Sequence, residues 1–435
     1  MEKIKIAVIG LGTVGSGVVK IINEKKEKIK KRFGFEIEIS ECADLDRSRY
    51  NSLVEAGYSC GCYYPDAFDL LQNTKANIIV ELIGGFEPAR SIVLEALQQG
   101  RSVVTANKEL ISRSGQEIFE AADRNGADVY FEAAVGGGIP IIRPLKDMLL
   151  VNDFTYVAGI VNGTTNYILT RMSKEGLDFE SSLKKAQGLG YAEPDPRADI
   201  EGDDAQAKIA ILASIAFNSR VTKEEVYKQG ITGITARDIV YARELGYCIK
   251  LIAYAARKEN KGIYAFVRPA LIPQTHPLSL VEDVYNAIYV KGDSCGELMF
   301  FGEGAGSLAA GSAVAGDIVE AARAIVSGSR GKTKCSCFEK FQVLPLDKFA
   351  SRYYVNLKAA DRPGVLAKIA GCFGDAGVSI ASVIQKESME GFANIVFMTH
   401  VTTEEKMKRA ISSIKSLDVV ESVENVLVVL DEEVL

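Results

Sequence analysis

A glycine pattern close to the first residue constrains the fold more than any other feature of this sequence. Residues 4–9 read as a short buried strand, and a helical pattern follows to about residue 28. Three glycines lie at the junction of the strand and the helix. Gly10 permits a tight turn, Gly12 lets a pyrophosphate approach the backbone, and Gly15 lets the helix pack on the strand. Amide groups at the helix N-terminus favour phosphate. The sequence therefore predicts a dinucleotide site that is formed by Gly10, Gly12, Thr13, Val14 and Gly15.

The end of the second predicted strand, residues 36–44, carries a mixed signal for the choice of dinucleotide. Asp44 stands where an acidic residue accepts a hydrogen bond from the ribose 2′-hydroxyl of NAD. Arg47 and Arg49 follow directly, and an arginine at this place can hold the 2′-phosphate of NADP. Both alternatives stay open.

Strands and helices then alternate, which predicts a doubly wound parallel sheet. Further strands are expected at 77–83, which reads as fully apolar, at 102–105 and at 128–132, with a helical and loop excursion at 50–73. Lys108 comes just after the strand at 102–105, where open α/β sheets place their ligands. The alternative for Lys108 is a solvated lysine at the start of a helix.

An acidic stretch, Tyr191 to Lys208, holds the strongest candidate for chemistry. Asp203 reads as an N-cap, and residues 205–217 read as a buried helix. Asp204 and Lys208 are four residues apart and share one helical face. A lysine beside a carboxylate on an apolar helix is an acid/base candidate. The alternative is a surface ion pair.

The remaining segments predict two further domains. Residues 133–140 contain three consecutive glycines, which suit either the wall of a substrate or cation site or a domain hinge. Strands are expected at 153–161, 249–257, 263–268, 285–291 and 296–301, which indicates an α+β domain with a mixed or antiparallel sheet. Residues 353–430 follow a β-α-β-β-α-β order, which is that of a ferredoxin-like unit.

Composition narrows the possible partners. The net charge is −6, so no broad basic surface exists for nucleic acid. No apolar run reaches the ~20 residues that span a bilayer, and the first strand begins at Ile4, so we expect a cytoplasmic protein. Two histidines in unrelated contexts argue against a zinc site or a Ser-His-Asp triad. Among eight cysteines, the pairs Cys60/Cys62 and Cys335/Cys337 are idle thiols or, less in keeping with their spacing, metal ligands.

Several motifs together resemble one family, the monofunctional homoserine dehydrogenases with a C-terminal ACT domain. The similarity covers residues 3–430 and rests on segments 10–15, 105–108, 132–140, 161–166, 188–208, 302–306 and 361–364. The pattern Ala-Asp199-x-x-Gly-x-Asp204-x-x-x-Lys208 is highly specific to this family.

The resemblance implies an NAD(P)-dependent oxidoreductase that reduces L-aspartate 4-semialdehyde to L-homoserine, the step shared by threonine, methionine and isoleucine biosynthesis. It implies that Lys208 donates a proton to the aldehyde oxygen and that Lys108 lies between nicotinamide and substrate. Substrate binding falls to Glu193, Asp199, Asp204, Gly163 and Thr164. Gly190 and Gly304 line the cofactor. Glu132, with the carbonyls of Val135, Gly137 and Ile139, matches the family's sodium site.

The same resemblance divides the chain into domains and supplies its partners. A Rossmann domain is expected at 1–133, completed by a helix at about 306–328. A catalytic and dimerisation domain is expected at 134–305, a linker at 329–350 and an ACT regulatory domain at 351–435. The implied partners are the small-molecule substrate, an amino-acid effector, with threonine as the leading candidate, and further copies of the chain in a homodimer or homotetramer.

Two other functions compete with this one. A regulatory protein could bind a nucleotide and an amino acid without turnover, although the intact set of Asp204, Lys208, Lys108 and Glu193 argues against it. A dehydrogenase for another amino-acid aldehyde is the third possibility.

Overall fold

The computed structural model describes residues 2–258, 262–332, 334–389, 391–431 and 434. The chain divides into two compact units. The first unit comprises Met1–Val157, Ala207–Val226 and Asn286–Phe341, and the second comprises Ala158–Gln206, Tyr227–Tyr285 and Gln342–Leu435. Two elements, β7 (Phe154–Ile160) and α9 (Asp203–Ala216), each begin in one unit and end in the other. None of the described helices is long and apolar enough to cross a membrane.

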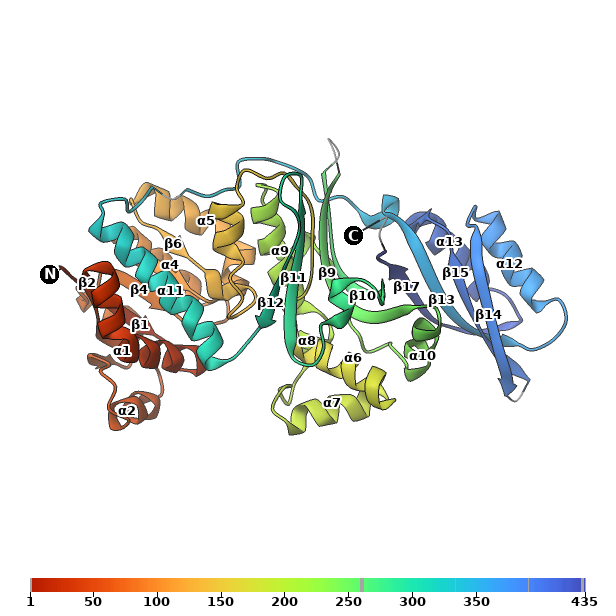
Figure 1. Cartoon of the computed structure of the whole chain (residues 1–435), viewed down its shortest axis with the longest axis horizontal. Coiled ribbons are helices and arrows are strands. Elements are labelled where there is room, and N and C mark those ends of the chain that lie inside the picture. Colours follow the sequence, from red (N-terminus) through yellow and green to blue (C-terminus); the bar gives the residue numbers. More distant parts are fainter. Residues whose placement is uncertain (1, 259–261, 333, 390, 432–433, 435) are drawn as a thin grey trace. The chain divides into compact units, whose positions relative to one another are not determined.

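The first unit is built on a parallel sheet. Its strands are β1 (Glu2–Ile9), β2 (Phe35–Ala43), β3 (Cys62–Tyr64), β4 (Ile78–Glu81), β5 (Ser102–Thr105) and β6 (Val129–Tyr130). They lie in the order β3-β2-β1-β4-β5-β6, and every pair in this sheet is parallel (Figure 1). The connecting helices are α1 (Thr13–Phe33), α2 (Arg47–Glu55), α3 (Ala67–Asn73), α4 (Ala89–Gln98) and α5 (Lys108–Arg124). The predicted doubly wound sheet is confirmed.

Helix α11 (Ser307–Val326) completes this unit by packing on α1 (Figure 1). The two helices approach so closely that a Cβ on Gly17 would lie 2.2 Å from the carbonyl oxygen of Ser307. Small residues on both helices make this contact possible. The hairpin of β11 (Tyr285–Gly292) and β12 (Gly296–Glu303) precedes α11 in the chain and leads into it.

Three expectations about the first unit need correction. The stretch 50–73, expected to contain helices and loops only, also contributes the edge strand β3, which pairs with β2. The strand expected at 128–132 is limited to Val129–Tyr130, and a short 3-10 turn takes up Glu132–Ala134. The strand expected at 77–83 is limited to Ile78–Glu81 and is not fully apolar, because it ends in a glutamate, Glu81, which is completely buried.

The second unit contains a mixed sheet with helices beside it. Its elements before the C-terminal segment are α6 (Gly163–Glu175), α7 (Phe179–Gly188), α8 (Arg197–Ile200), β8 (Tyr227–Lys228), α10 (Ala236–Glu244), β9 (Tyr247–Lys258) and β10 (Gly262–Pro273). β9 runs antiparallel to β10, whereas β8 runs parallel to it. Asp203 was expected to cap α9 but is its first residue, and the acidic stretch forms one helical turn, α8, where no regular helix was expected.

The C-terminal segment confirms the ferredoxin-like order. It runs through β13 (Ala350–Ala360), α12 (Val365–Asp375), β14 (Ile380–Met389), β15 (Phe392–Thr399), a two-residue strand β16 (Thr402–Thr403), α13 (Glu404–Lys415) and β17 (Val420–Val429). Within the sheet the order is β17-β13-β15-β14, and these neighbours are antiparallel.

This segment is joined to the rest of the second unit by backbone and by buried polar contacts. β17 pairs with β10 in parallel, so one sheet continues from β9 and β10 into the C-terminal strands. Asp238 of α10 is fully buried and accepts hydrogen bonds from Tyr354 (2.9 Å), Asn356 (2.7 Å) and Asn425 (2.6 Å). The segment is therefore an integral part of the second unit and not a detached module.

Candidate active site

The glycine loop between β1 and α1 has room for a ligand at one place only among its three motif glycines. Gly10 has φ +96°, and a Cβ there would lie 2.7 Å from the backbone of Leu82. A Cβ on Gly15 would lie 1.9 Å from the carbonyl oxygen of Gly10, so the helix packs directly on the turn. At Gly12 the nearest atom to such a Cβ is Nη1 of Arg49, at 3.7 Å. The open approach at Gly12 is where a pyrophosphate would reach the backbone.

Asp44, at the end of β2, is held by the backbone of the same loop. Its Oδ2 accepts the amide of Leu11 at 2.7 Å, and its Oδ1 accepts the amide of Asp46 at 2.8 Å. Arg49 lies 3.4 Å from Asp44 and has half of its side chain exposed, whereas the Arg47 guanidinium stands over the ring of Tyr63, 5.3 Å from its centre. Of the two arginines, Arg49 is the one beside Gly12.

The ends of β4 and β5 are tied together by a buried carboxylate. Glu81 accepts hydrogen bonds from Thr105 Oγ1 at 2.7 Å and from the amide of Ile83 at 2.9 Å. Burial raises the pKa of Glu81 above its ordinary value. Asn107, next in line, donates to the carbonyl of Gly85 and caps α5 at Leu110. This chain of contacts fixes the start of α5, whose first residue is the half-buried Lys108.

Two glycine segments of the first unit pack against each other. The amide of Gly138 donates to the carbonyl of Glu303 at 3.2 Å, and a Cβ on Gly137 (φ +54°) would lie 2.5 Å from the carbonyl oxygen of Gly304. Gly304 is equally confined, because a Cβ there would lie 1.9 Å from Nδ2 of Asn286. The segments expected to hold a cation and to line the cofactor are thus neighbours.

The side chain of Glu132 is committed to backbone amides. Its Oε1 accepts the amides of Ile141 (2.6 Å) and Ile142 (2.8 Å), and its Oε2 accepts the amide of Arg143 at 2.8 Å. The carboxylate therefore organises the turn after the glycine run. Asp317 of α11 accepts the backbone amide of Glu132 at 2.8 Å, and burial raises the pKa of Asp317 to about 7.

Lys208 lies in the middle of α9, in a run of buried alanine, isoleucine and leucine residues. Only 9% of its surface is exposed, so the side chain does not extend into bulk solvent. Asp204 precedes it by one helical turn on the same helix. A surface ion pair, the alternative weighed from sequence, does not describe a lysine this deeply buried.

The side-chain amide of Asn162 joins two acidic residues of the second unit, Asp199 and Asp204. Asn162 caps α6 through its Oδ1, which accepts the amide of Thr165 at 2.9 Å. Its Nδ2 donates to Asp199 at 2.7 Å and to Asp204 at 2.9 Å. The hydroxyl of Thr164 lies 3.0 Å from the other oxygen of Asp199. Two carboxylates are thereby held side by side, which is an arrangement that favours a bound cation such as a substrate ammonium.

Gly190 and Glu193 are more exposed to solvent than Asp199 and Asp204. Gly190 has φ +76° and an open Cβ position, and Glu193 is exposed to solvent. The backbone carbonyl of Glu193 accepts a hydrogen bond from Gln187 at 3.1 Å, so α7 anchors this segment. The structure places Glu193 at the surface of the second unit, four residues before the start of α8, the helical turn that contains Asp199.

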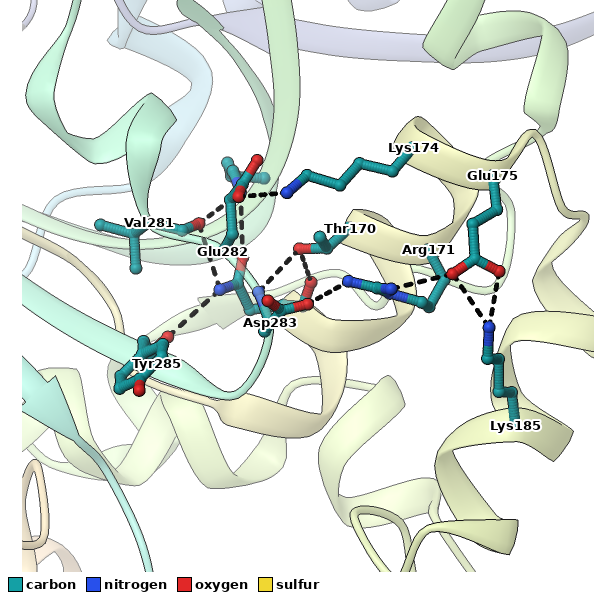
Figure 2. A network of polar contacts seen from close by, with 11 residues as sticks. Thr170, Arg171, Lys174, Glu175, Lys185, Val281, Glu282, Asp283 and Tyr285 are labelled. Atoms are coloured by element: carbon teal, nitrogen blue, oxygen red, sulfur yellow. Dashed lines mark hydrogen bonds and ion pairs between the residues drawn. The ribbon is translucent and has the colours of Figure 1, made fainter.

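A polar network joins the C-terminal half of α6 to the loop 281–285 (Figure 2). Arg171 pairs with Asp283 and Glu175, and Lys174 pairs with Glu282. The backbone amide of Asp283 donates to Thr170 Oγ1 at 3.1 Å. These contacts hold the loop 281–285 on α6, and a Cβ on Gly163 would lie only 2.7 Å from the carbonyl oxygen of Val284 in that loop. Gly163 is needed for this close approach.

Sequence reasoning missed three residues that shape the site. Asn286, Glu81 and Asp317 were not singled out, although each holds a predicted residue, strand end or glycine in place. A buried carboxylate inside an apolar strand was a visible signal for Glu81. The segment 162–166 reads from sequence as a turn that caps a helix, and the structure confirms the cap. The bridge from Asn162 to two carboxylates was missed, because it depends on contacts across 37 and 42 residues.

The comparisons with known proteins agree along nearly the whole chain. Residues 10–132 match the family model of the homoserine dehydrogenase NAD binding domain, residues 140–319 match homoserine dehydrogenase, and residues 353–419 match the ACT domain. The homoserine dehydrogenase of Mycobacterium tuberculosis is 43% identical over 435 residues, covering 98% of this chain and 97% of its own. That of Neisseria gonorrhoeae is 41% identical over 427 residues, covering 97% of both.

Solved structures give the same result. A homoserine dehydrogenase from Thiobacillus denitrificans superposes with a TM-score of 0.93 at 40% identity and covers 99% of both chains. A hyperthermophilic archaeal homoserine dehydrogenase mutant in complex with NADPH superposes with a TM-score of 0.62 at 30% identity, covering 74% of this chain and 98% of its own. The chain therefore belongs to the homoserine dehydrogenase family of NAD(P)-dependent oxidoreductases and carries a C-terminal ACT domain.

Proposed function

We propose that this chain reduces L-aspartate 4-semialdehyde to L-homoserine, with Lys208 as the proton donor. The observation that carries the proposal is the pair of carboxylates, Asp199 and Asp204, gathered by Asn162, with the buried Lys208 one turn beyond Asp204 on α9. This is the residue set that an amino-acid aldehyde requires, because the substrate offers an ammonium, a carboxylate and a reducible carbonyl.

The charges explain how the roles divide. Hydride arriving at the aldehyde carbon leaves negative charge on the oxygen, and an ammonium held beside that oxygen stabilises it and supplies the proton. Lys208 supplies this ammonium and donates the proton. Lys108, the first residue of α5, helps to orient the substrate beside the nicotinamide. Asp199 and Asp204 bind the substrate ammonium, with Glu193 as a further ligand. Gly163 and Thr164 shape the same pocket.

Steady-state turnover tests the activity itself. The full-length protein is mixed with aspartate semialdehyde and NADPH, and oxidation of the nicotinamide is followed by its absorbance. Continuous oxidation with formation of homoserine is expected. Tight binding of NADPH without turnover would instead favour a regulatory protein, and faster turnover with a longer or shorter amino-acid aldehyde would favour another dehydrogenase.

For the cofactor, the proposal is that NADPH is preferred over NADH and that both are used. Both oxygens of Asp44 already accept backbone amides, whereas the half-exposed Arg49 lies beside Gly12 and can meet a 2′-phosphate. A hydrogen bond to a charged group contributes about 1.5–3 kcal/mol, so Arg49→Ala should raise KM for NADPH by roughly 10- to 100-fold. KM for NADH should change little, and an equal loss for both cofactors would contradict this role.

A monovalent cation, with sodium as the first candidate, is proposed at the glycine run after Glu132. Val135, Gly137 and Ile139 are buried, and within the described residues their carbonyl oxygens accept no hydrogen bond. Buried carbonyl groups are nearly always partnered, so three free ones suit a hard cation. Since amides occupy the Glu132 carboxylate, Glu132 would contribute through its backbone oxygen. Activity in sodium compared with a bulky organic cation at equal ionic strength tests the site.

Feedback control by an amino acid, with threonine as the first candidate, is proposed for the ACT segment. The turn Asp361-Arg-Pro-Gly364 precedes α12, whose N-cap Gly364 (φ +87°) makes no side-chain cap, so helix amides can meet a carboxylate. Deleting residues 350–435 would not be a clean test, because β17 pairs with β10. Slower hydrogen exchange of the 361–368 amides on addition of threonine, together with inhibition, is expected; unchanged exchange and activity would refute it.

The assembly and domain boundaries belong to the same proposal. A homodimer or homotetramer is expected, and light scattering of the full-length chain measures it. The domains are a Rossmann part at 1–133 completed by the helix at about 306–328, a catalytic part at 134–305, a linker at 329–350 and the ACT part at 351–435.

A further inference from the structure

Two cysteines of the first unit lie in a setting that the dehydrogenase reaction does not use. Cys335 and Cys337 follow α11 on a segment that bends at Ser336, and both thiols are free and half-buried. The Cys337 sulfur lies 3.6 Å from the carbonyl oxygen of Ser214, near the end of α9. The two thiols are two residues apart across this bend and form a hydrogen bond with each other.

A fixed cation faces the first of these thiols. Nη2 of Arg220 donates to the Cys335 sulfur at 3.2 Å. The guanidinium also stands 5.9 Å from the centre of the Phe119 ring, and a Cβ on Gly115 would lie 2.6 Å from Nη1. Arg220 is therefore held against α5 and cannot easily turn away, which makes it a permanent partner for a thiolate at Cys335.

A second cation shares this environment. Lys146 stands over the rings of Phe119 and Phe131, 5.6 Å and 5.3 Å from their centres, and burial lowers the pKa of Lys146. Lys146, Arg220 and both cysteines line one cavity together with apolar side chains. The hydrogen bond from Cys337, with Arg220 and Lys146, lowers the pKa of Cys335. The same hydrogen bond and burial raise the pKa of Cys337.

The same two cysteines also line an open groove, so small solutes can reach them. The groove carries the carboxylates of Glu120, Asp123 and Glu339 and the ammonium of Lys340 on its other walls. Within the part of the chain that the structure describes, none of these acidic groups forms a hydrogen bond with the Cys335 sulfur, whereas Arg220 does. Access from the groove, and cations on the cavity side, distinguish this pair from the buried thiols Cys42 and Cys60.

We propose that Cys335 and Cys337 form a modification site for hydrogen peroxide, with Cys335 as the reactive thiolate and Cys337 as the resolving thiol. The Cys335 sulfur attacks the peroxide, an S–O bond forms as the O–O bond breaks, and the leaving hydroxide takes a proton to become water. Cys337 then attacks that sulfur, an S–S bond forms as the S–O bond breaks, and a second water leaves with the thiol proton. The two sulfurs are oxidised by two electrons and the peroxide is reduced.

The position of the pair connects this chemistry to the helices that carry the lysines. Arg220 packs against Gly115 of α5, the helix that begins at Lys108, and Cys337 contacts Ser214 of α9, the helix that carries Lys208. Oxidation removes the negative charge beside Arg220 and changes the contact with Ser214. Loss of turnover on oxidation, restored by a thiol reductant, is the expected consequence.

The test compares Cys335 with Cys62, an exposed and free cysteine of the same chain. At about pH 6, below the pKa of about 8.5 of an ordinary thiol, iodoacetamide should label Cys335 at least ~10-fold faster than Cys62 in the full-length protein. In protein that has not been alkylated, treatment with hydrogen peroxide should lower the mass of the peptide that contains both thiols by two hydrogens. In Cys337→Ser, the same treatment should leave a sulfenic acid that a 1,3-dione probe labels at Cys335.

Two results would overturn the proposal. One is labelling of Cys335 no faster than that of Cys62, which needs no variant and so does not depend on folding. The other is a peroxide-treated peptide of unchanged mass. Cys335→Ser should abolish both the probe label and the disulfide while its circular dichroism stays that of the parent protein.

Discussion

Replacing Asn162 by Asp separates the two functions of that residue. Aspartate caps a helix about as well as asparagine, so the start of α6 should be preserved. The donor that joins Asp199 and Asp204, at 2.7 Å and 2.9 Å, becomes a third acceptor instead. The variant therefore tests the bridge and spares the cap.

The size of the effect follows from the bonds that are lost. Each hydrogen bond to a charged group contributes about 1.5–3 kcal/mol. Because Asp199 and Asp204 are partly exposed, the lower end of that range applies, and the loss of two bonds should cost about 3 kcal/mol of unfolding free energy at neutral pH. In Asn162→Ala the bridge and the cap are both lost, which should add about 1 kcal/mol.

The pH dependence gives the sharper test. Three adjacent carboxylates in the folded variant bind a proton more readily than the same groups in the unfolded chain. A group that takes up a proton more readily when folded adds stability as pH falls, so the deficit of Asn162→Asp should shrink below about pH 6. Urea unfolding of the parent, Asn162→Asp and Asn162→Ala across this pH range measures it. A variant as stable as the parent at neutral pH, or a deficit independent of pH, would refute the bridge.

Two further predictions concern the first unit. Burial raises the pKa of Asp317 to about 7, so the folded state keeps this proton up to about pH 7, whereas the unfolded chain releases it at about pH 4. Stability should therefore decline as pH rises from about 4 to 7. Asp317→Asn should flatten that decline in urea unfolding curves, and an unchanged slope would contradict the assignment. Gly304→Ala would put a Cβ 1.9 Å from Asn286 Nδ2, so KM for the cofactor should rise on the order of tenfold, and Asn286→Ser in the same chain should recover most of it, whereas additive losses would argue against the clash.

Local patterns were sufficient to predict the two ends of the chain. The glycine loop and the alternation of strands and helices specify the parallel sheet, because each element has its own periodicity and turn residues. The ferredoxin-like order of residues 353–430 was readable for the same reason. The pairing of β17 with β10 was not, since Val428 and Ala270 are brought together by tertiary structure without any local signal.

Within the site, sequence reasoning found residues whose types suggest chemistry and missed those that hold them. Asp204 and Lys208 stand out because their spacing matches a helical turn. Asn162 does not stand out, because a capping asparagine is common and its second donor meets carboxylates far along the chain. The three-residue strand β3 was missed because such a short apolar run has no periodicity.

The account depends most on Lys208 as the proton donor, and turnover of Lys208→Ala tests it most directly. The exposed Lys184 supplies a matched control, Lys184→Ala, and binding of NADPH is measured by its fluorescence in each protein. The account predicts a fall in kcat of roughly 10²- to 10⁴-fold for Lys208→Ala, with NADPH binding retained and the control unaffected. A kcat for Lys208→Ala equal to that of the control would contradict it.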